Sequence, residues 1–100
     1  MGVVIGSLKW QTSENDDIII KALNALRNEY GLKDADSQLV GVPNHGYTYF
    51  NIELGGINLW WNGGESKAKE LFSNVFNKAQ TILGAHGVES SEPYTHFFPM

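Results

Sequence analysis

The sequence predicts an α+β fold with a four-stranded mixed sheet, in the order β-α-β-β-β-α, and two helices packed on one face. Three observations support this: short β-rich segments, two longer segments with apolar residues at helical spacing, and glycine-rich turns between them. The 100 residues match the usual size of one domain. We expect residues 1–84 to form a single domain, followed by a C-terminal tail over residues 85–100 that is free to pack on the sheet.

The first half of the chain predicts a strand, a helix and a second strand. Residues 3–10 are rich in β-forming residues and alternate between two faces. A helix should follow, with Ser13 as its N-cap, and run to about Tyr30, because apolar residues recur every three or four positions. Residues 37–42 then form a short strand before the turn "PNHG".

The second half predicts two more strands and a second helix. Residues 47–54 and 57–61 are β-rich and are separated by Gly55-Gly56, a strong signal for a two-residue hairpin. A helix is expected over residues 66–83, where an apolar stripe recurs at helical spacing and a glycine follows.

The expected hairpin assigns opposite roles to two adjacent tryptophans. A two-residue loop at Gly55-Gly56 opposes Phe50 to Trp61, on the face that carries the other apolar residues of both strands. Neighbouring side chains in a strand point to opposite faces, so Trp60 should lie on the other face. The sequence therefore predicts that Trp61 is the core tryptophan and that Trp60 faces outward.

The outward sheet face is the main candidate site. Each predicted helix has one apolar stripe, and both stripes are needed to cover the first face, so only the tail remains to cover the second one. An uncovered apolar patch of this kind usually marks an interaction surface. The alternative is that the tail buries these side chains as ordinary core. The candidate partner-binding residues are Tyr47, Tyr49 and Trp60, with Asn51, Glu53 and Asn58 as a polar rim.

The sequence offers little support for catalysis or for a bound cofactor. The chain has no cysteine, its three histidines are dispersed, and it shows no nucleophile elbow or phosphate-binding loop. We therefore expect no enzyme activity, no catalytic residues, no metal site and no cofactor. No apolar run approaches the roughly 20 residues of a membrane span, so we expect no membrane partner and a cytoplasmic location.

Part of the chain resembles the double-stranded-RNA-binding domain. The order helix, three-strand meander, helix is expected over about residues 16–83, and "LVGVPNHGYTYF", "FNIELGG" and "SKAKELF" are similar to that family's first hairpin, second strand and second helix. The extra N-terminal strand also resembles ribosome hibernation-promoting factors. The resemblance implies RNA or ribosome binding through His45 in the hairpin loop and through Lys67 and Lys69 at the helix start.

Three functions follow from these observations. The leading hypothesis is a non-catalytic protein-binding module, of adaptor or inhibitor type, that uses the aromatic sheet face. The second is RNA or ribosome binding, which is disfavoured by the formal charge of −4 because phosphate contacts need several cations. The third is a self-associating structural domain, a homodimer through the sheet face.

Overall fold

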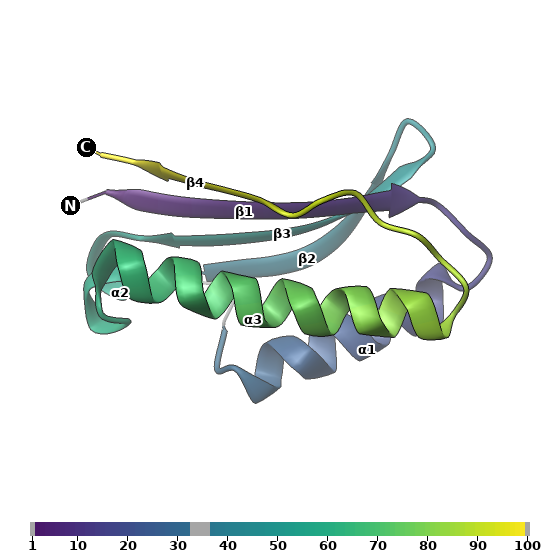
Figure 1. Cartoon of the computed structure of the whole chain (residues 1–100), viewed down its shortest axis with the longest axis horizontal. Helices are drawn as coiled ribbons and strands as arrows, with labels where there is room; N and C mark the ends of the chain where they lie inside the picture. The colour runs from purple at the N-terminus through teal and green to yellow at the C-terminus, as the bar shows by residue number, and fades with distance from the viewer. Residues whose placement is uncertain (1, 33–36, 100) are drawn as a thin grey trace.

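The protein forms two layers, an antiparallel sheet and a layer of helices. The computed structural model describes residues 2–32 and 37–99, and Figure 1 shows the sheet lying above the helices. The elements are β1 (Val3–Gln11), α1 (Asp16–Glu29), β2 (Ser37–Asn44), β3 (Tyr47–Gly55), α2 (Gly56–Trp61), α3 (Gly64–Ala85) and β4 (Tyr94–Phe98). The sheet has the strand order β2-β3-β1-β4, the arrangement of the split β-α-β motif.

The α+β class is confirmed, but the predicted mixed sheet is wrong. All three strand pairings are antiparallel: β1 pairs with β3 and with β4, and β2 pairs with β3. No parallel pair forms among the described strands. Strand β3 instead lies between β2 and β1, and β1 pairs with it along nine residues, from Val3 opposite Gly55 to Gln11 opposite Tyr47.

The predicted strand over residues 57–61 is also wrong, because this segment is the helix α2. Gly55 ends β3, and Gly56 adopts a positive φ of 56° that starts the helix instead of closing a hairpin. Since β2 and β1 occupy both sides of β3, no edge of β3 is left for a further strand. The expected pairing of Phe50 with Trp61 is therefore absent, and Phe50 pairs with Leu8 and Gly41.

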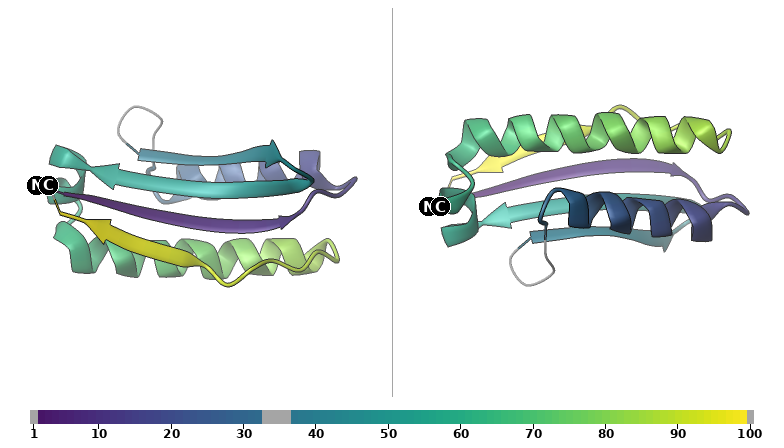
Figure 2. Two further views of the ribbon diagram at one scale, coloured as in Figure 1. Left: turned by 90° about the horizontal axis from the view of Figure 1, so that it is seen from above. Right: turned by 90° about the horizontal axis from the view of Figure 1, so that it is seen from below.

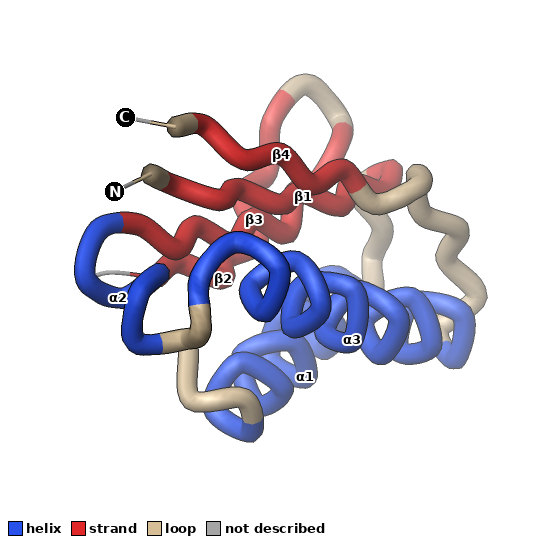
Figure 3. The backbone as a smooth tube through the Cα atoms, turned by 60° about the vertical axis from the view of Figure 1, so that its left-hand side comes forward, coloured by secondary structure: helices blue, strands red, loops and turns tan. Residues whose placement is uncertain are grey.

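Within residues 2–32 and 37–99 the chain forms three helices where two were expected. The two long helices are confirmed as α1 and α3, and they cover the same face of the sheet (Figure 2). The N-cap of α1 is Asn15 and not Ser13; the Ser13 hydroxyl instead accepts a hydrogen bond from the Asn15 N–H at 3.2 Å. Figure 3 shows the third helix, α2, at the end of the sheet, between β3 and α3.

The C-terminal segment adds the fourth strand in the plane of the sheet. Residues Tyr94–Phe98 form β4, which pairs with β1 from Ser7 opposite Tyr94 to Val3 opposite Phe98. Phe97 points toward the helices and packs against the core, whereas Tyr94, His96 and Phe98 are exposed. This segment therefore extends one edge of the sheet.

The core lies between the sheet and the two long helices. Alternate residues of β1 and β3 are buried there, and Phe50 of β3 meets Phe76 of α3 edge to face, with ring centroids 5.8 Å apart. Gly6 permits this close packing: a Cβ at Gly6 would lie 2.7 Å from a Phe76 ring carbon and 2.8 Å from one of Phe72. The inward positions of β1 and β3 thus face α3 directly.

A buried carboxylate ties the start of α1 to the sheet. Asp16 accepts hydrogen bonds from the Trp10 indole N–H (3.0 Å), from the Ser13 backbone N–H (3.1 Å) and from the Thr48 hydroxyl. Burial raises the pKa of Asp16, but the hydrogen bonds from Thr48, Trp10 and Ser13 outweigh it, so that the pKa is lowered from its ordinary value of 3.8. Folding therefore favours the charged form of Asp16.

Candidate functional site

The sheet face opposite the helices is the first candidate surface. We call it the open face, because among the described elements the helices α1 and α3 cover only the other side (Figure 2). Side chains alternate along a strand, so every second residue of each strand lies on this face. Its side chains are Val3, Ile5, Ser7 and Lys9 from β1, Tyr47, Tyr49, Asn51 and Glu53 from β3, and Tyr94, His96 and Phe98 from β4.

The open face has a polar centre with aromatic residues at its margins. The Ser7 hydroxyl donates to the Asn51 side-chain oxygen at 2.7 Å, in a shallow depression between β1 and β3. The Lys9 ammonium lies 5.1 Å from the centroid of the Tyr47 ring, within reach of a cation–π interaction. On β4, the ring of His96 stacks with Tyr94 and meets Phe98 edge to face at 4.4 Å.

The structure separates the six predicted partner-binding residues into two groups. Tyr47, Tyr49, Asn51 and Glu53 lie together on the open face, as expected from the alternation of β3. Trp60 and Asn58 do not join them, because residues 56–61 are helical. The predicted core role of Trp61 is likewise wrong: its side chain is 75% exposed, and the buried tryptophan is Trp10.

Helix α2 forms the second candidate surface, which we call the tryptophan ridge and define as Ile57, Trp60 and Trp61. These positions follow the i, i+3, i+4 spacing that places side chains on one side of a helix. All three side chains are exposed, Ile57 at 59%, Trp60 at 73% and Trp61 at 75%, whereas Leu59 is buried in the core. The helix is thus held by one apolar residue and presents three others to solvent.

Backbone contacts hold α2 in place. The Gly56 N–H donates to the Gly2 carbonyl at 3.2 Å, which joins the start of α2 to the beginning of the chain. At the other end, the Asn58 carbonyl accepts from both the backbone N–H of Asn62 (3.1 Å) and its side-chain amide (2.7 Å). Gly63 and Gly64 then adopt positive φ values of 89° and 86°, which turn the chain into α3.

The residues of the RNA-binding hypothesis lie at two ends of the molecule. His45 is in the turn between β2 and β3 with a φ of 54°, and it is exposed. Lys67 and Lys69 lie at the start of α3, beyond the far end of the nine-residue strand β3 (Figure 1). Lys69 pairs with Glu65 at 2.9 Å and Lys67 with Glu70 at 3.6 Å. The structure does not bring these three side chains together.

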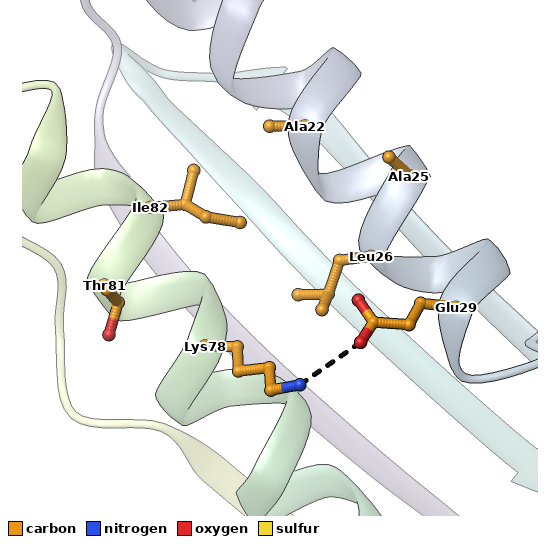
Figure 4. A pocket seen from close by; sticks show the side chains of 7 residues that line it. All are labelled: Ala22, Ala25, Leu26, Glu29, Lys78, Thr81 and Ile82. Atoms are coloured by element: carbon orange, nitrogen blue, oxygen red, sulfur yellow. Dashed lines mark hydrogen bonds and ion pairs between the residues drawn. The ribbon is translucent and has the colours of Figure 1, made fainter.

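A groove between α1 and α3 is the third surface with a defined shape (Figure 4). It has a volume of about 380 Å³, and Leu26 and Ile82 contribute apolar side chains to its lining. The Lys78 ammonium lies 3.3 Å from the Glu29 carboxylate across the groove and 5.1 Å from the Tyr30 ring centroid, and contacts with Tyr30 and Glu29 raise its pKa. The groove carries small residues and one exposed ion pair, with no convergent polar groups among the side chains that line it.

Neither a cluster of metal-ligating side chains nor a membrane-spanning helix is found in the described part of the chain. Within residues 2–32 and 37–99, no three His, Asp or Glu side chains gather closely enough to hold a metal ion. None of the helices in these ranges has the length and apolar character needed to cross a bilayer.

Sequence reasoning missed several exposed side chains. The strand prediction places Ile57 and Trp61 in the core, although Ile57, Trp60 and Trp61 also have helical spacing in the sequence. Tyr94, His96 and Phe98 fall in the predicted tail, although four of the five residues of "YTHFF", which stands between two prolines, are of types that favour strands. Both signals are short, and this explains why they were ambiguous.

Comparison with known proteins supports the fold but does not assign the chain to a family. No protein-family model matches the chain, and no curated protein matches its sequence. Among solved structures, a C-terminal segment of the alpha subunit of aIF2 from Pyrococcus abyssi is similar, with a TM-score of 0.55 and 16% identity over 89% of this chain and 47% of that one. The de novo designed protein Foldit4 is similar with a TM-score of 0.55 and 10% identity, over 99% of this chain and 97% of that one. The chain spans about half the length of the first neighbour, and at these identities the likeness shows the fold alone.

Proposed function

We propose that this chain is a non-catalytic protein-binding module of adaptor or inhibitor type, and that the tryptophan ridge is its main contact surface. The observation that carries the proposal is the exposure of Trp60 and Trp61, at 73% and 75%, beside the exposed Ile57. Tryptophan is the residue type most enriched at binding hot spots, and an alanine substitution there typically costs roughly 2 kcal/mol or more.

The ridge suits binding because its helix and its indole side chains lose little conformational entropy when a partner binds. Leu59 is buried, the Gly56 N–H bonds the Gly2 carbonyl, and the Asn58 carbonyl caps the C-terminal end of α2. An indole has two rotatable bonds, so immobilising it costs less entropy than immobilising a lysine or a methionine. A partner with an apolar groove would therefore gain most of the burial energy of both rings.

The open face provides a second part of the proposed surface. Tyr47, Tyr49, Asn51 and Glu53 lie together there, and β3 leads directly into α2. Aromatic side chains with hydroxyl groups, next to an amide and a carboxylate, are suited to a polar and partly wet contact. We assign this group a secondary role, because its aromatic side chains are less exposed than the two tryptophans of the ridge: Tyr47 is 43% exposed and Tyr49 is half-buried.

The RNA-binding alternative ranks below protein binding. It needs His45, Lys67 and Lys69 to reach one nucleic acid, and each lysine is already next to a glutamate. Phosphate-led affinity grows with the number of phosphate charges that are neutralised, and the chain has a formal charge of −4. The cytoplasmic location stays part of the proposal, since a chain without cysteine is suited to a reducing compartment.

The test compares the wild-type chain with a Trp60→Ala/Trp61→Ala variant as bait in affinity capture, followed by titration against each purified protein recovered. Ile18→Ala is the matched control, because Ile18 is another exposed large apolar side chain and lies on α1, away from the ridge. We expect a partner whose affinity falls at least about 30-fold in the double variant, the equivalent of roughly 2 kcal/mol, and is unchanged in the control. If every recovered protein binds all three chains equally, the ridge is not the contact surface.

A further inference from the structure

We propose that β4 pairs with β4 of a second copy of this chain, which forms a two-fold symmetric dimer with a continuous eight-stranded antiparallel sheet. This inference does not rest on the tryptophan ridge and concerns a different part of the surface. It starts from the two edges of the sheet, β2 and β4, which differ in how well they are protected against strand pairing.

The edge at β2 contains an obstacle to pairing that β4 lacks. Pro43 lies within β2 and has no backbone N–H to donate. The five residues of β4, "YTHFF", include no proline, glycine, lysine or carboxylate, and its exposed side chains are Tyr94, His96 and Phe98. Natural edge strands usually carry charges, prolines or bulges that prevent pairing with another chain, so an edge without them is open to a partner strand.

The hydrogen bonds of Lys9 show which backbone groups of β4 are free to pair. The Lys9 carbonyl accepts from the Ser91 N–H at 2.8 Å, and its N–H donates to the Ser91 hydroxyl at 3.2 Å, so both groups point toward β4. Backbone direction alternates along a strand, so Val3, Ile5 and Ser7 point the same way and bond their partners Phe98, His96 and Tyr94. It follows that Thr95 and Phe97 direct their N–H and C=O groups away from the sheet.

Among the self-complementary registers open to these groups, the one that pairs Thr95 with Phe97 makes the most hydrogen bonds, because the others bring Pro93 or Pro99 into a hydrogen-bonding position. If Thr95 faces Phe97 of a second, antiparallel copy, each pair exchanges two hydrogen bonds, and the two symmetric pairs exchange four. The two-fold axis then passes beside His96. On the open face, Tyr94 lies opposite Phe98 of the second copy, and the two His96 side chains lie opposite each other. Aromatic cross-strand pairs of this kind are favourable, and the register places no two carboxylates or ammonium groups opposite each other.

Helix α3 lies beneath this edge and would face its symmetry mate in the dimer. Gln80 donates to the Ser90 hydroxyl at 3.3 Å and to the Ser91 carbonyl at 3.4 Å, so this flank of α3 faces the chain that leads into β4. Ser73 and Lys69, two and three turns earlier, lie on the same flank; Ser73 has a short uncharged side chain, and the Lys69 ammonium is paired with Glu65 at 2.9 Å. A pairing of five residues buries less than a standard interface of about 1,600 Å², so the dimer belongs to the weak class.

The sharpest test is amide hydrogen exchange on the wild-type chain over a dilution series from about 1 mM down to the micromolar range, where weak dimers dissociate. Tyr94, His96 and Phe98 bond β1 within one chain, so their amides should be protected at every concentration. The amides of Thr95 and Phe97 should gain protection, at least about tenfold, only as the concentration rises. Protection of Thr95 and Phe97 that does not change with concentration would overturn the pairing.

A charge-introducing variant gives an independent measurement. His96→Lys places two ammonium groups opposite each other across the two-fold axis, and like charges in directly opposed positions are unfavourable. The matched control is Val42→Lys, which puts the same charge on an exposed position of the other edge strand. Sedimentation equilibrium should show a dissociation constant at least about tenfold higher for His96→Lys and an unchanged one for Val42→Lys.

Two other outcomes would contradict the proposal. A wild-type chain that stays monomeric at about 1 mM has no such dimer. A dimer that survives His96→Lys but is lost in Trp60→Ala/Trp61→Ala associates through the ridge and not through β4. Because capture of a partner by the ridge does not require dimerisation, failure here leaves the proposed function intact.

Discussion

Trp10 and the adjacent pair Trp60 and Trp61 show the same side chain in two opposite roles. Trp10 is 1% exposed, and its indole N–H donates to the buried Asp16 carboxylate. Trp60 and Trp61 are about three-quarters exposed on a six-residue helix. A buried indole needs a partner for its N–H, whereas an exposed one leaves a large apolar surface in water. The difference separates a residue that holds the fold from two that stabilise a contact only when something covers them.

Removing Trp10 should have the largest effect on stability. Trp10→Ala empties a large core volume and also takes one hydrogen-bond donor from Asp16. We expect the free energy of unfolding to fall by about 3–5 kcal/mol, the range for large-to-small core substitutions. Urea denaturation followed by circular dichroism measures it. A loss below about 1 kcal/mol would mean that Trp10 is not the structural tryptophan.

Leu59 connects the two roles, because it fastens the exposed ridge to the core. Leu59→Ala should lower the free energy of unfolding by about 2–3 kcal/mol, toward the low end for leucine because the site lies at the end of the sheet and can partly collapse. It should also loosen α2 locally, so that the amide of Asn62, bonded to Asn58, exchanges faster than in the wild type, whereas amides in α3 change less. Unchanged exchange at Asn62 would show that α2 keeps its local stability without the Leu59 side chain.

A substitution of Asp16 tests the hydrogen bond that the Trp10 indole N–H makes in the core. Asp16→Asn should lower the free energy of unfolding by about 2 kcal/mol at neutral pH. Neutral hydrogen bonds replace the charged ones, and the new amide NH₂ lies next to N–H groups that also donate. The pKa of Asp16 is lowered in the folded state, so its contribution is complete above the ordinary value of 3.8 and is lost as the pH falls through the lower, folded pKa.

The matching measurement is denaturation of both chains over a pH series. The wild type should lose more stability than Asp16→Asn between pH 3.8 and the folded pKa, and the two curves should run parallel above that interval. Equal slopes throughout would show that other carboxylates dominate the acid response.

The local patterns of the long elements were readable from the sequence. The first strand, with Val4, Leu8 and Trp10 on one face, and the two long helices appear where period and breakers predicted them. The outward grouping of Tyr47 and Tyr49 was also predictable, because nine residues of β3 alternate without a break.

The strand partners were not readable, because they depend on competition between distant segments. The pattern at Gly55-Gly56 fits a hairpin, yet β1, which comes some 50 residues earlier, occupies the side of β3 that the hairpin would need. Five residues such as 57–61 fit one strand or one and a half helical turns equally well. The mistaken strand placed Trp60 on the sheet face, whereas the structure places it on α2, so one of the predicted anchors is missing from the open face.

The smallest expected effect on stability belongs to the ridge itself. Trp60→Ala/Trp61→Ala should change the free energy of unfolding by no more than about 0.5 kcal/mol per site, because surface side chains with few contacts contribute little to folding. Fluorescence gives the companion test: in the wild type, acrylamide should quench the two exposed indoles strongly, and the double variant should retain only the weakly quenched emission of Trp10. A cost above about 2 kcal/mol would instead assign Trp60 and Trp61 to the packing of the fold, and the contrast with Trp10, on which the proposed contact surface depends, would no longer hold.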